Sequence, residues 1–252
     1  MSALRLRDLG LAYGRRVALA GVEASIASGE RVAVLGPNGA GKSSLLRCIS
    51  GVVRPTQGTV VLDAVPLEEL SRERIARRIA VVPQQVDLPF AIRVEEVVAL
   101  GRIPYERSFR GPEAADREVV AEAIHRVGLD DFVGRDAREL SLGERQLVLI
   151  AMAVAQQARL LLLDEPTVHL DLRHQVQVMD LLADLNERDG LTIVAVLHDL
   201  ALAARYFPRV LVLQAGRLVA DGPPADVLAA DHVRATFGVD ATLWLPGLPP
   251  PV

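Results

Sequence analysis

Apolar residues along this chain follow two kinds of pattern, which predict different elements. Nearly unbroken apolar runs over 31–36, 159–164 and 192–197 predict short strands that are buried on both faces. Longer segments between them, such as 42–50, carry apolar residues at helical spacing. This alternation predicts an α/β fold with a mainly parallel sheet. Because each run leads into a glycine, carboxylates or a histidine, we expect ligands to bind at the carboxyl edge of the sheet.

Two regions depart from this scheme. Residues 3–27 and 58–63 alternate between apolar and polar and carry turn residues, which predicts a small antiparallel layer beside the main sheet. Residues 94–156 carry helical patterns, including 113–127 and 142–156, and they predict a helical subdomain inserted into the α/β core.

The chain is expected to form one domain over residues 1–240. After residue 216 it should return to a small strand and short helices, and its end should be a loose, proline-rich tail. The predicted boundaries are 1–84 and 157–230 for the core with its β layer, 85–156 for the helical subdomain and 241–252 for the tail.

The composition indicates a folded protein that does not bind nucleic acid. Half of the 252 residues are hydrophobic, which is enough for a sizeable core, so disorder is not expected. The formal net charge is −4 and the pI is about 5.8, whereas nucleic-acid binders usually show a basic excess.

The cysteine content and the length of the apolar runs indicate the cellular compartment in which the protein is expected. The single cysteine, Cys48, cannot form an internal disulfide, which fits a reducing compartment, and its apolar surroundings predict a buried structural thiol. The N-terminus lacks the apolar core of a signal peptide, and the longest apolar run, 147–155, is too short to span a membrane. We therefore expect a soluble cytoplasmic protein that meets a membrane only through a partner.

Residues 36–43, Gly-Pro-Asn-Gly-Ala-Gly-Lys-Ser, fit the phosphate-loop pattern G-x-x-x-x-G-K-[ST]. Glycines let backbone N–H groups converge on an anion, and the following helix offers its positive N-terminal end. Lys42 would bring charge to the β and γ phosphates, and the Ser43 hydroxyl would bind Mg²⁺. A chance match in a glycine-rich turn is the alternative, but the position between a predicted strand and helix favours nucleotide binding.

Two carboxylates, Asp164 and Glu165, follow a run of leucines. Asp164 would hold Mg²⁺ through its water shell, and Glu165 would polarise a water for attack on the γ phosphate. The alternative is a pair that caps the next helix, and the upstream phosphate loop favours catalysis.

Single residues complete the set of candidates. His198 follows a predicted strand at the same sheet edge, where it would bond the γ phosphate or the attacking water, although a structural histidine is the alternative. Tyr13 would stack on a base, although ordinary packing explains it equally well. Gln84 is ambiguous by itself. The other histidines show no metal-ligand spacing: His125, His169, His174 and His232.

A second stretch, Leu140-Ser-Leu-Gly-Glu-Arg-Gln146, completes a resemblance to the ATP-binding subunits of ABC transporters over about residues 3–240. The resemblance implies that family's fold: a P-loop NTPase core, an N-terminal antiparallel β layer and an inserted helical subdomain. It places the family's motifs on Tyr13 (adenine stacking), 36–44 (Walker A), Gln84 (Q-loop), Asp164 and Glu165 (Walker B), Asp171 (D-loop) and His198 (switch).

These positions imply binding and catalytic roles. ATP is expected to contact Tyr13, Pro37, Asn38, Gly39, Ala40, Gly41, Lys42, Ser43, Ser44, Gln84, Ser141, Gly143 and Asp171. Mg²⁺ is expected to bind near Ser43, Gln84 and Asp164, and catalysis is expected of Glu165, His198 and Lys42.

The resemblance also implies an assembly. Two copies of such a subunit pair head to tail, with each ATP between one phosphate loop and the other copy's Leu-Ser-Gly-Gly-Gln turn. Ser141 and Gly143 open a predicted helix whose free N–H groups suit a γ phosphate. The homodimer would serve two transmembrane permease subunits at the cytoplasmic face of the inner membrane, with 85–105 as the contact, and would act indirectly with an extracytoplasmic substrate-binding protein.

Four positions depart from the family pattern. Leu142 stands where the family has glycine, Glu144 where it has glutamine, and Val168-His169 where small residues are common. Leu142 adds a branched side chain near the docking phosphate, and Glu144 adds negative charge. If both point away from the nucleotide, the amides still function; otherwise closure on ATP is weakened.

Further stretches resemble the importer branch that serves ferric siderophores, haem and cobalamin: 147–151, 165–171, 221–228 and 237–240. The alternatives are an ATPase subunit for another solute or an exporter, a non-transport ABC protein, and an ATP-dependent switch with little hydrolysis. The cargo does not follow from these residues, because they never touch it.

Overall fold

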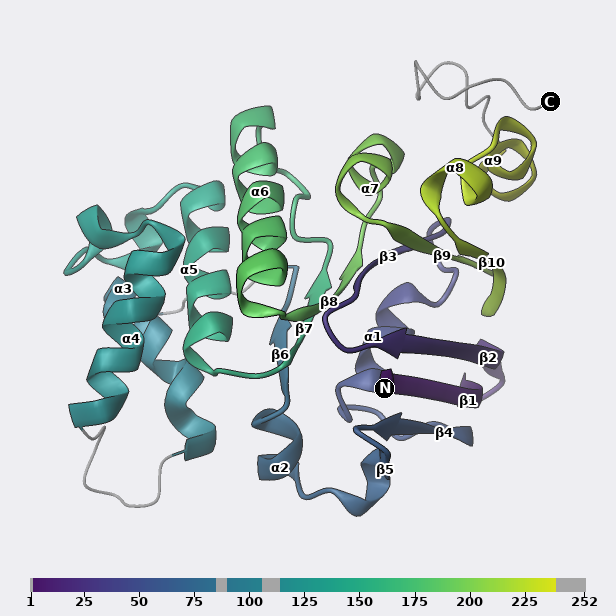
Figure 1. Cartoon of the computed structure of the whole chain (residues 1–252), viewed down its shortest axis with the longest axis horizontal. Helices are drawn as coiled ribbons and strands as arrows, with labels where there is room; N and C mark the ends of the chain where they lie inside the picture. The colour runs from purple at the N-terminus through teal and green to yellow at the C-terminus, as the bar shows by residue number, and fades with distance from the viewer. Residues whose placement is uncertain (1, 85–89, 106–113, 239–252) are drawn as a thin grey trace.

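The computed structural model describes residues 2–84, 90–105 and 114–238, which form two sheets with helices around them (Figure 1). In this part of the chain, an antiparallel sheet has the order β2-β1-β4-β5, and a second sheet has the order β10-β9-β3-β8-β7-β6. The strands are β1 (Ser2–Tyr13), β2 (Arg16–Ala27), β3 (Arg31–Leu35), β4 (Gln57–Leu62), β5 (Val65–Pro66), β6 (Ile79–Val82), β7 (Leu160–Asp164), β8 (Thr192–Val196), β9 (Arg209–Gln214) and β10 (Arg217–Gly222).

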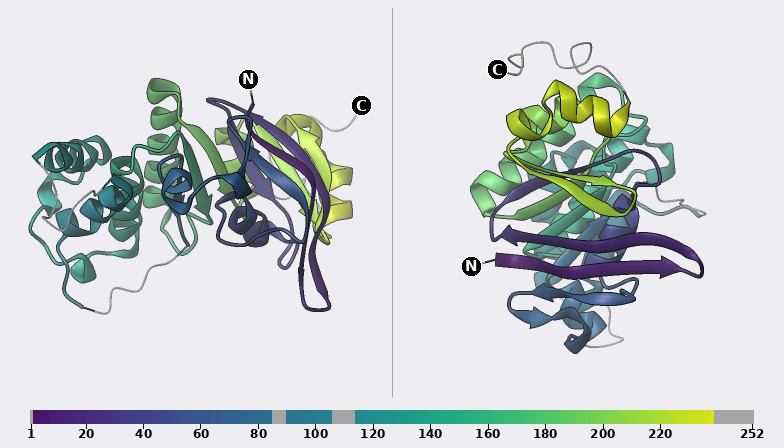
Figure 2. Two further views of the ribbon diagram at one scale, coloured as in Figure 1. Left: turned by 90° about the horizontal axis from the view of Figure 1, so that it is seen from below. Right: turned by 90° about the vertical axis from the view of Figure 1, so that its right-hand side faces the viewer.

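The helices lie mostly on the other side of the second sheet from the antiparallel layer (Figure 2). The α-helices are α1 (Lys42–Ile49), α2 (Arg72–Ala76), α3 (Val94–Ala99), α4 (Ala114–Val127), α5 (Leu142–Ala155), α6 (Leu172–Asp189), α7 (Leu200–Tyr206), α8 (Pro224–Val227) and α9 (Ala230–Phe237). Short 3-10 helices are η1 (Leu67–Glu69), η2 (Leu100–Tyr105), η3 (Asp130–Phe132) and η4 (Ala137–Glu139).

The second sheet is covered on both faces, which explains its apolar strands. Along β7, Leu160 and Leu162 pack with α1 and the antiparallel layer, whereas Leu161 and Leu163 pack with the helices α3 to α8. Strands β3, β6, β7, β8 and β9 run parallel, and only β10 pairs antiparallel within this sheet as described. The predicted α/β fold with its mainly parallel sheet is confirmed.

The hydrophobic pattern predicted most of these elements. The predicted strands correspond to β3, β7 and β8, the antiparallel layer is present, and 94–156 is helical within the described ranges. The pattern did not single out β6 or β9. The predicted tail, 241–252, and residues 85–89 lie outside the described residues.

Two smaller expectations concern Cys48 and the membrane. Cys48 is fully buried, and this burial raises the pKa of its thiol to about 11, as expected for a structural thiol. Among the helices of the described ranges, none has both the length and the apolar character required to cross a membrane.

Candidate nucleotide site

Polar residues gather along one edge of the parallel sheet. Strands β3, β8, β7 and β6 are neighbours in that order. Gly36, His198, Asp164 and Gln84 come at or just after the carboxyl ends of these strands, so they lie along the same edge in the same order. The sheet order therefore brings together candidates that are far apart in the sequence. Gln84 is exposed at this edge.

The phosphate loop between β3 and α1 contains two glycines, Gly36 and Gly41, that have no room for a side chain. At Gly36, with φ 152°, a Cβ would lie 2.1 Å from the carbonyl oxygen of Leu213. At Gly41, with φ 106°, it would lie 2.5 Å from the carbonyl oxygen of Ala18. The loop is thus packed against β9 and β2. Because its glycines lack side chains, its backbone N–H groups can approach an anion closely.

Lys42 begins α1, with its side chain folded back into the loop. It is 5% exposed, and its Nζ donates to the carbonyl oxygens of Gly36 at 2.7 Å and Pro37 at 3.2 Å. Burial lowers the pKa of this amine, whereas the carboxylates of Glu165 and Asp164 act in the opposite direction. The ammonium group is therefore already placed beside the loop that would hold phosphates.

Ser43 and Asp164 form a pair of oxygen ligands. The Ser43 hydroxyl donates to Oδ1 of Asp164 at 3.3 Å. Burial raises the pKa of Asp164, while the bond from Ser43 lowers it. A hydroxyl and a half-buried carboxylate are the kind of hard oxygen donors that Mg²⁺ prefers, and a cation would favour the charged form of Asp164. These residues fit a magnesium ion.

Glu165 and His198 are in direct contact. Glu165 adopts φ 53°, and its N–H donates to the carbonyl oxygen of Val196 at 3.1 Å. Its Oε1 contacts Nε2 of His198, and the two side chains are 16% and 38% exposed. This arrangement places a carboxylate and an imidazole, both capable of proton transfer, beside the Ser43–Asp164 pair.

The hairpin of β1 and β2 lies beside the phosphate loop. Tyr13, 44% exposed, ends β1 and is paired with Arg16, which begins β2. The Nη2 atom of Arg16 lies 3.7 Å from where a Cβ of Gly39 would stand. Sequence reasoning missed Arg16, although its position in a tight hairpin after Tyr13 was a usable signal. The exposed ring of Tyr13 agrees better with a stacking surface than with core packing.

The second stretch forms the start of α5. Ser141 is the N-cap, and its hydroxyl accepts the N–H of Glu144 at 3.3 Å, while Oε2 of Glu144 accepts the N–H of Ser141 at 2.7 Å. This is a capping box. Among the described residues, the amides of Leu142 and Gly143 have no bonded partner, and Leu142 is 53% exposed.

Asp171 is the N-cap of α6. Its Oδ1 accepts the N–H of His174 at 2.9 Å, and this bond and that of the His174 ring lower the pKa of Asp171. His169, just before it, adopts φ 61°. Within the described part of the chain, no hydrogen bond or ion pair joins 141–144 or Asp171 to the phosphate loop. The structure thus brings the candidates at the sheet edge together around the phosphate loop. Among the described residues, 141–144 and Asp171 form no bond with that loop.

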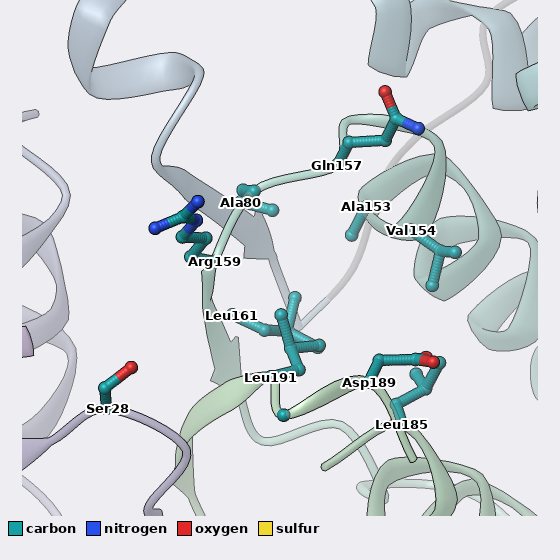
Figure 3. Close-up of a pocket in the computed structure, with 12 residues that line it drawn as sticks. Ser28, Ala80, Ala153, Val154, Gln157, Arg159, Leu161, Leu185, Asp189 and Leu191 are labelled. Carbon is teal, nitrogen blue, oxygen red and sulfur yellow. The ribbon is translucent and has the colours of Figure 1, made fainter.

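A pocket of about 420 Å³ lies at the opposite edge of the sheet (Figure 3). It is lined by residues near the amino ends of the strands, among them Ser28, Arg159 and Leu191. None of the predicted site residues is among those that line it.

The strand order, with a glycine loop between β3 and α1, defines the class of the protein as a P-loop nucleotide-binding protein. A sequence profile described as "ABC transporter" matches residues 19–168. The chain is 37% identical to the iron(3+)-hydroxamate import ATP-binding protein FhuC of Bacillus subtilis, over 96% of this chain and 90% of FhuC. The chain therefore belongs to the ABC transporter family, as an ATPase.

Other similarities agree with this assignment. The chain is 45% identical to the cobalamin import ATP-binding protein BtuD of Halobacterium salinarum, over 91% of this chain but only 57% of BtuD. Among solved structures, cbiO1 of Clostridium perfringens, part of an ABC transporter complex, is 31% identical with a TM-score of 0.81, over 97% and 96% of the two chains. A dimeric ATP-binding cassette in a post-hydrolysis state with ADP and phosphate is 30% identical with a TM-score of 0.75, over 88% and 98%.

Proposed function

We propose that this protein is the energy-coupling ATPase subunit of an ABC importer for a ferric siderophore, haem or cobalamin. The observation that carries its chemistry is the meeting of Ser43, Asp164, Glu165 and His198 at the sheet edge that holds the phosphate loop. We further propose that residues 1–240 act as one domain, because α3 to α5 share a core with the sheet.

ATP binds with its phosphates on the loop and its base against Tyr13. The amides of 37–44 and the positive end of α1 hold the phosphates, and Lys42 exchanges its bonds to loop carbonyls for bonds to phosphate oxygens. Ser43, Asp164 and Gln84 would hold Mg²⁺, which would supply charge neutralisation at the phosphates.

Hydrolysis requires a base near the γ phosphate. Glu165 accepts the proton of the attacking water, and His198 orients the Glu165 carboxylate through their contact and bonds the γ phosphate. Glu165, whose side chain is 16% exposed, is partly shielded from water, which strengthens its interaction with the imidazole.

A second copy completes each site. Ser141, Gly143 and Asp171 are not bonded to their own phosphate loop, and α5 presents free amides at Leu142 and Gly143. These amides bind the γ phosphate held by the partner subunit, so two copies close head to tail on ATP and separate after hydrolysis.

The dimer acts at the cytoplasmic face of the cell membrane. It binds two permease subunits, with 85–105 as part of the contact, and serves an extracytoplasmic substrate-binding protein indirectly. The cargo class is supported by the import functions in the names of FhuC and BtuD. Purified complexes with the permease should show ATPase stimulation by a binding protein loaded with ferric hydroxamate, haem or cobalamin, and that comparison identifies the cargo.

The head-to-tail model predicts that Glu165→Gln traps a dimer. The amide keeps a polar contact to His198 but cannot accept the proton, so ATP persists between the two copies. Light scattering during size exclusion, with saturating ATP and Mg²⁺, should show twice the monomer mass of 27.2 kDa.

The control is Lys42→Ala in the Glu165→Gln protein, which should stay monomeric because the phosphates lose their cation. If Glu165→Gln alone remains monomeric at saturating ATP, the head-to-tail model fails for this chain.

A further inference from the structure

The first turns of α5 and α6 are joined by the side chain of His174. The two helices pack side by side next to the parallel sheet (Figure 1). A Cβ on Gly143 would lie 2.3 Å from both Cγ and Cδ2 of His174 and 2.9 Å from its Cβ. These are the three nearest heavy atoms, so the histidine occupies the space that any side chain at position 143 would need.

The same ring is bonded to the N-cap of its own helix. Its Nδ1 lies 2.9 Å from both carboxylate oxygens of Asp171, and the His174 N–H donates to Oδ1 of that residue. The His174 side chain is 24% exposed, whereas that of Asp171 is 65% exposed. The ring is therefore fixed between the Asp171 carboxylate and Gly143.

The ring also acts on a carboxylate of α5. The pKa of Glu144 is lowered first by its bonds with Ser141, and the charges of Arg135 and His174 lower it further. His174 thus has a carboxylate from each helix in its surroundings.

We propose that His174 is a positioning residue that fixes the Ser141 turn against the Asp171 turn, and that Gly143 is glycine because it must receive this ring. The first residues of α6 follow the loop that carries Glu165, so the link connects the chain's own catalytic loop to the turn that serves the partner's nucleotide. In this last respect the inference rests on the proposed function.

A double-mutant cycle separates this role from direct contact between Gly143 and phosphate. Gly143→Ala should lower kcat about tenfold, and His174→Ala should lower it severalfold, with the KM for ATP little changed in both. Adding Gly143→Ala to His174→Ala should cause a clearly smaller loss than Gly143→Ala alone, because the two 2.3 Å contacts to the ring are gone and only the 2.9 Å contact to Cβ remains. Two losses that multiply would show that position 143 serves the phosphate alone, and would overturn the proposal.

A conservative variant and a matched control sharpen the result. His174→Asn keeps a donor for Asp171 and a planar group over Gly143, so it should retain activity within about twofold of the wild type. Gly222→Ala should change nothing, since the nearest atom to its Cβ would be at an ordinary 3.5 Å. Equal losses for His174→Asn and His174→Ala would contradict the proposed role.

Amide hydrogen exchange on the nucleotide-free protein tests the link without any dimer. Gly143→Ala should speed exchange both at 141–146 and at 171–176. In the His174→Ala background, Gly143→Ala should cause little further increase in exchange at these two segments. Faster exchange at 141–146 alone would overturn the positioning role. If the Glu165→Gln dimer fails to form while this coupled exchange is present, the assembly model has failed and the intramolecular link has not.

Discussion

Leu142 and Glu144 depart from the family turn, and their side chains behave differently. Glu144 directs its carboxylate back to the N–H of Ser141, 2.7 Å away, so its charge is engaged within its own helix. Leu142 is 53% exposed in the first turn of α5, beside the free amides that the proposed function assigns to phosphate. Of the two departures, the leucine is therefore the one positioned to obstruct docking.

Replacing this side chain should show whether it obstructs the partner's nucleotide. Leu142→Gly should raise ATP turnover roughly threefold, equivalent to about 0.7 kcal/mol in the barrier, and leave nucleotide affinity of the monomer unchanged. Steady-state ATPase assays and nucleotide titration measure both quantities. Val52→Ala, at another exposed apolar residue, is the control and should have no effect. Unchanged turnover in Leu142→Gly would mean that the leucine is harmless.

Three helices that begin near candidate residues, α5, α6 and α7, have side-chain caps, whereas α1 begins after Gly41 without one. Ser141 caps α5, Asp171 caps α6, and Asp199, next to His198, caps α7 by accepting two backbone N–H groups. Such caps fix the first turn, where the free amides of a helix lie. These capping residues therefore stabilise the helices and also position the groups that the proposed function uses.

The capping box of α5 predicts a pH-dependent contribution to stability. Glu144→Ala should lower the free energy of unfolding by about 0.5 kcal/mol at pH 7, because the N–H of Ser141 loses its acceptor. The folded-state pKa of Glu144 lies below its ordinary 4.5, so the contribution is complete above that value and is lost as pH falls through the folded pKa.

Urea denaturation at pH 7 and near pH 3.5 measures this difference. Glu144→Gln keeps an acceptor for the capping box without a charge that titrates, so its effect at pH 7 should be smaller. A difference between wild type and Glu144→Ala that grows on acidification would contradict this account.

Across the whole molecule, a buried ion pair ties η2 to α4 and α5. Arg102, 7% exposed, donates from Nε to Asp116 at 2.8 Å and from Nη1 to the carbonyl oxygen of Ala155 at 2.8 Å. Its guanidinium also lies 4.0 Å from the ring centre of Tyr105. Arg77, just after α2, donates to the carbonyl oxygen of Pro104 at 2.8 Å, so η2 joins the helical part to the sheet.

Removing one partner of this pair should destabilise the whole chain. Asp116→Ala leaves the Arg102 charge buried without its carboxylate and should lower the free energy of unfolding by about 3 kcal/mol. The double variant Arg102→Met with Asp116→Leu should recover part of that loss, because it removes both buried charges. Denaturation midpoints test this prediction, and a double variant less stable than Asp116→Ala would contradict it.

The sequence predicted a strand correctly where the strand's own apolar residues were enough to identify it. Leu160–Asp164 and Thr192–Val196 are apolar on both faces, so they could be recognised as buried strands without knowing their neighbours. Ile79–Val82 was missed because it has only four residues and one of them, Val81, is exposed. Arg209–Gln214 was missed although its four central residues are apolar and buried. Arg16 was missed because it lies near Gly39 only where the β1–β2 hairpin passes the phosphate loop.

The sequence by itself determined the phosphate loop, since its glycines, Lys42 and Ser43 are consecutive and act through local backbone conformation. It also determined the family, because the short motifs and their order along the chain can be recognised in the sequence alone. Only the tertiary structure decided that Glu165 contacts His198, that Glu144 bonds its own helix start, and that His174 fills the space over Gly143. The contacts of Glu165 and His174 depend on strand order and helix packing, which bring distant residues together. The bond of Glu144 depends on a choice of side-chain conformation that its letter in the sequence does not specify.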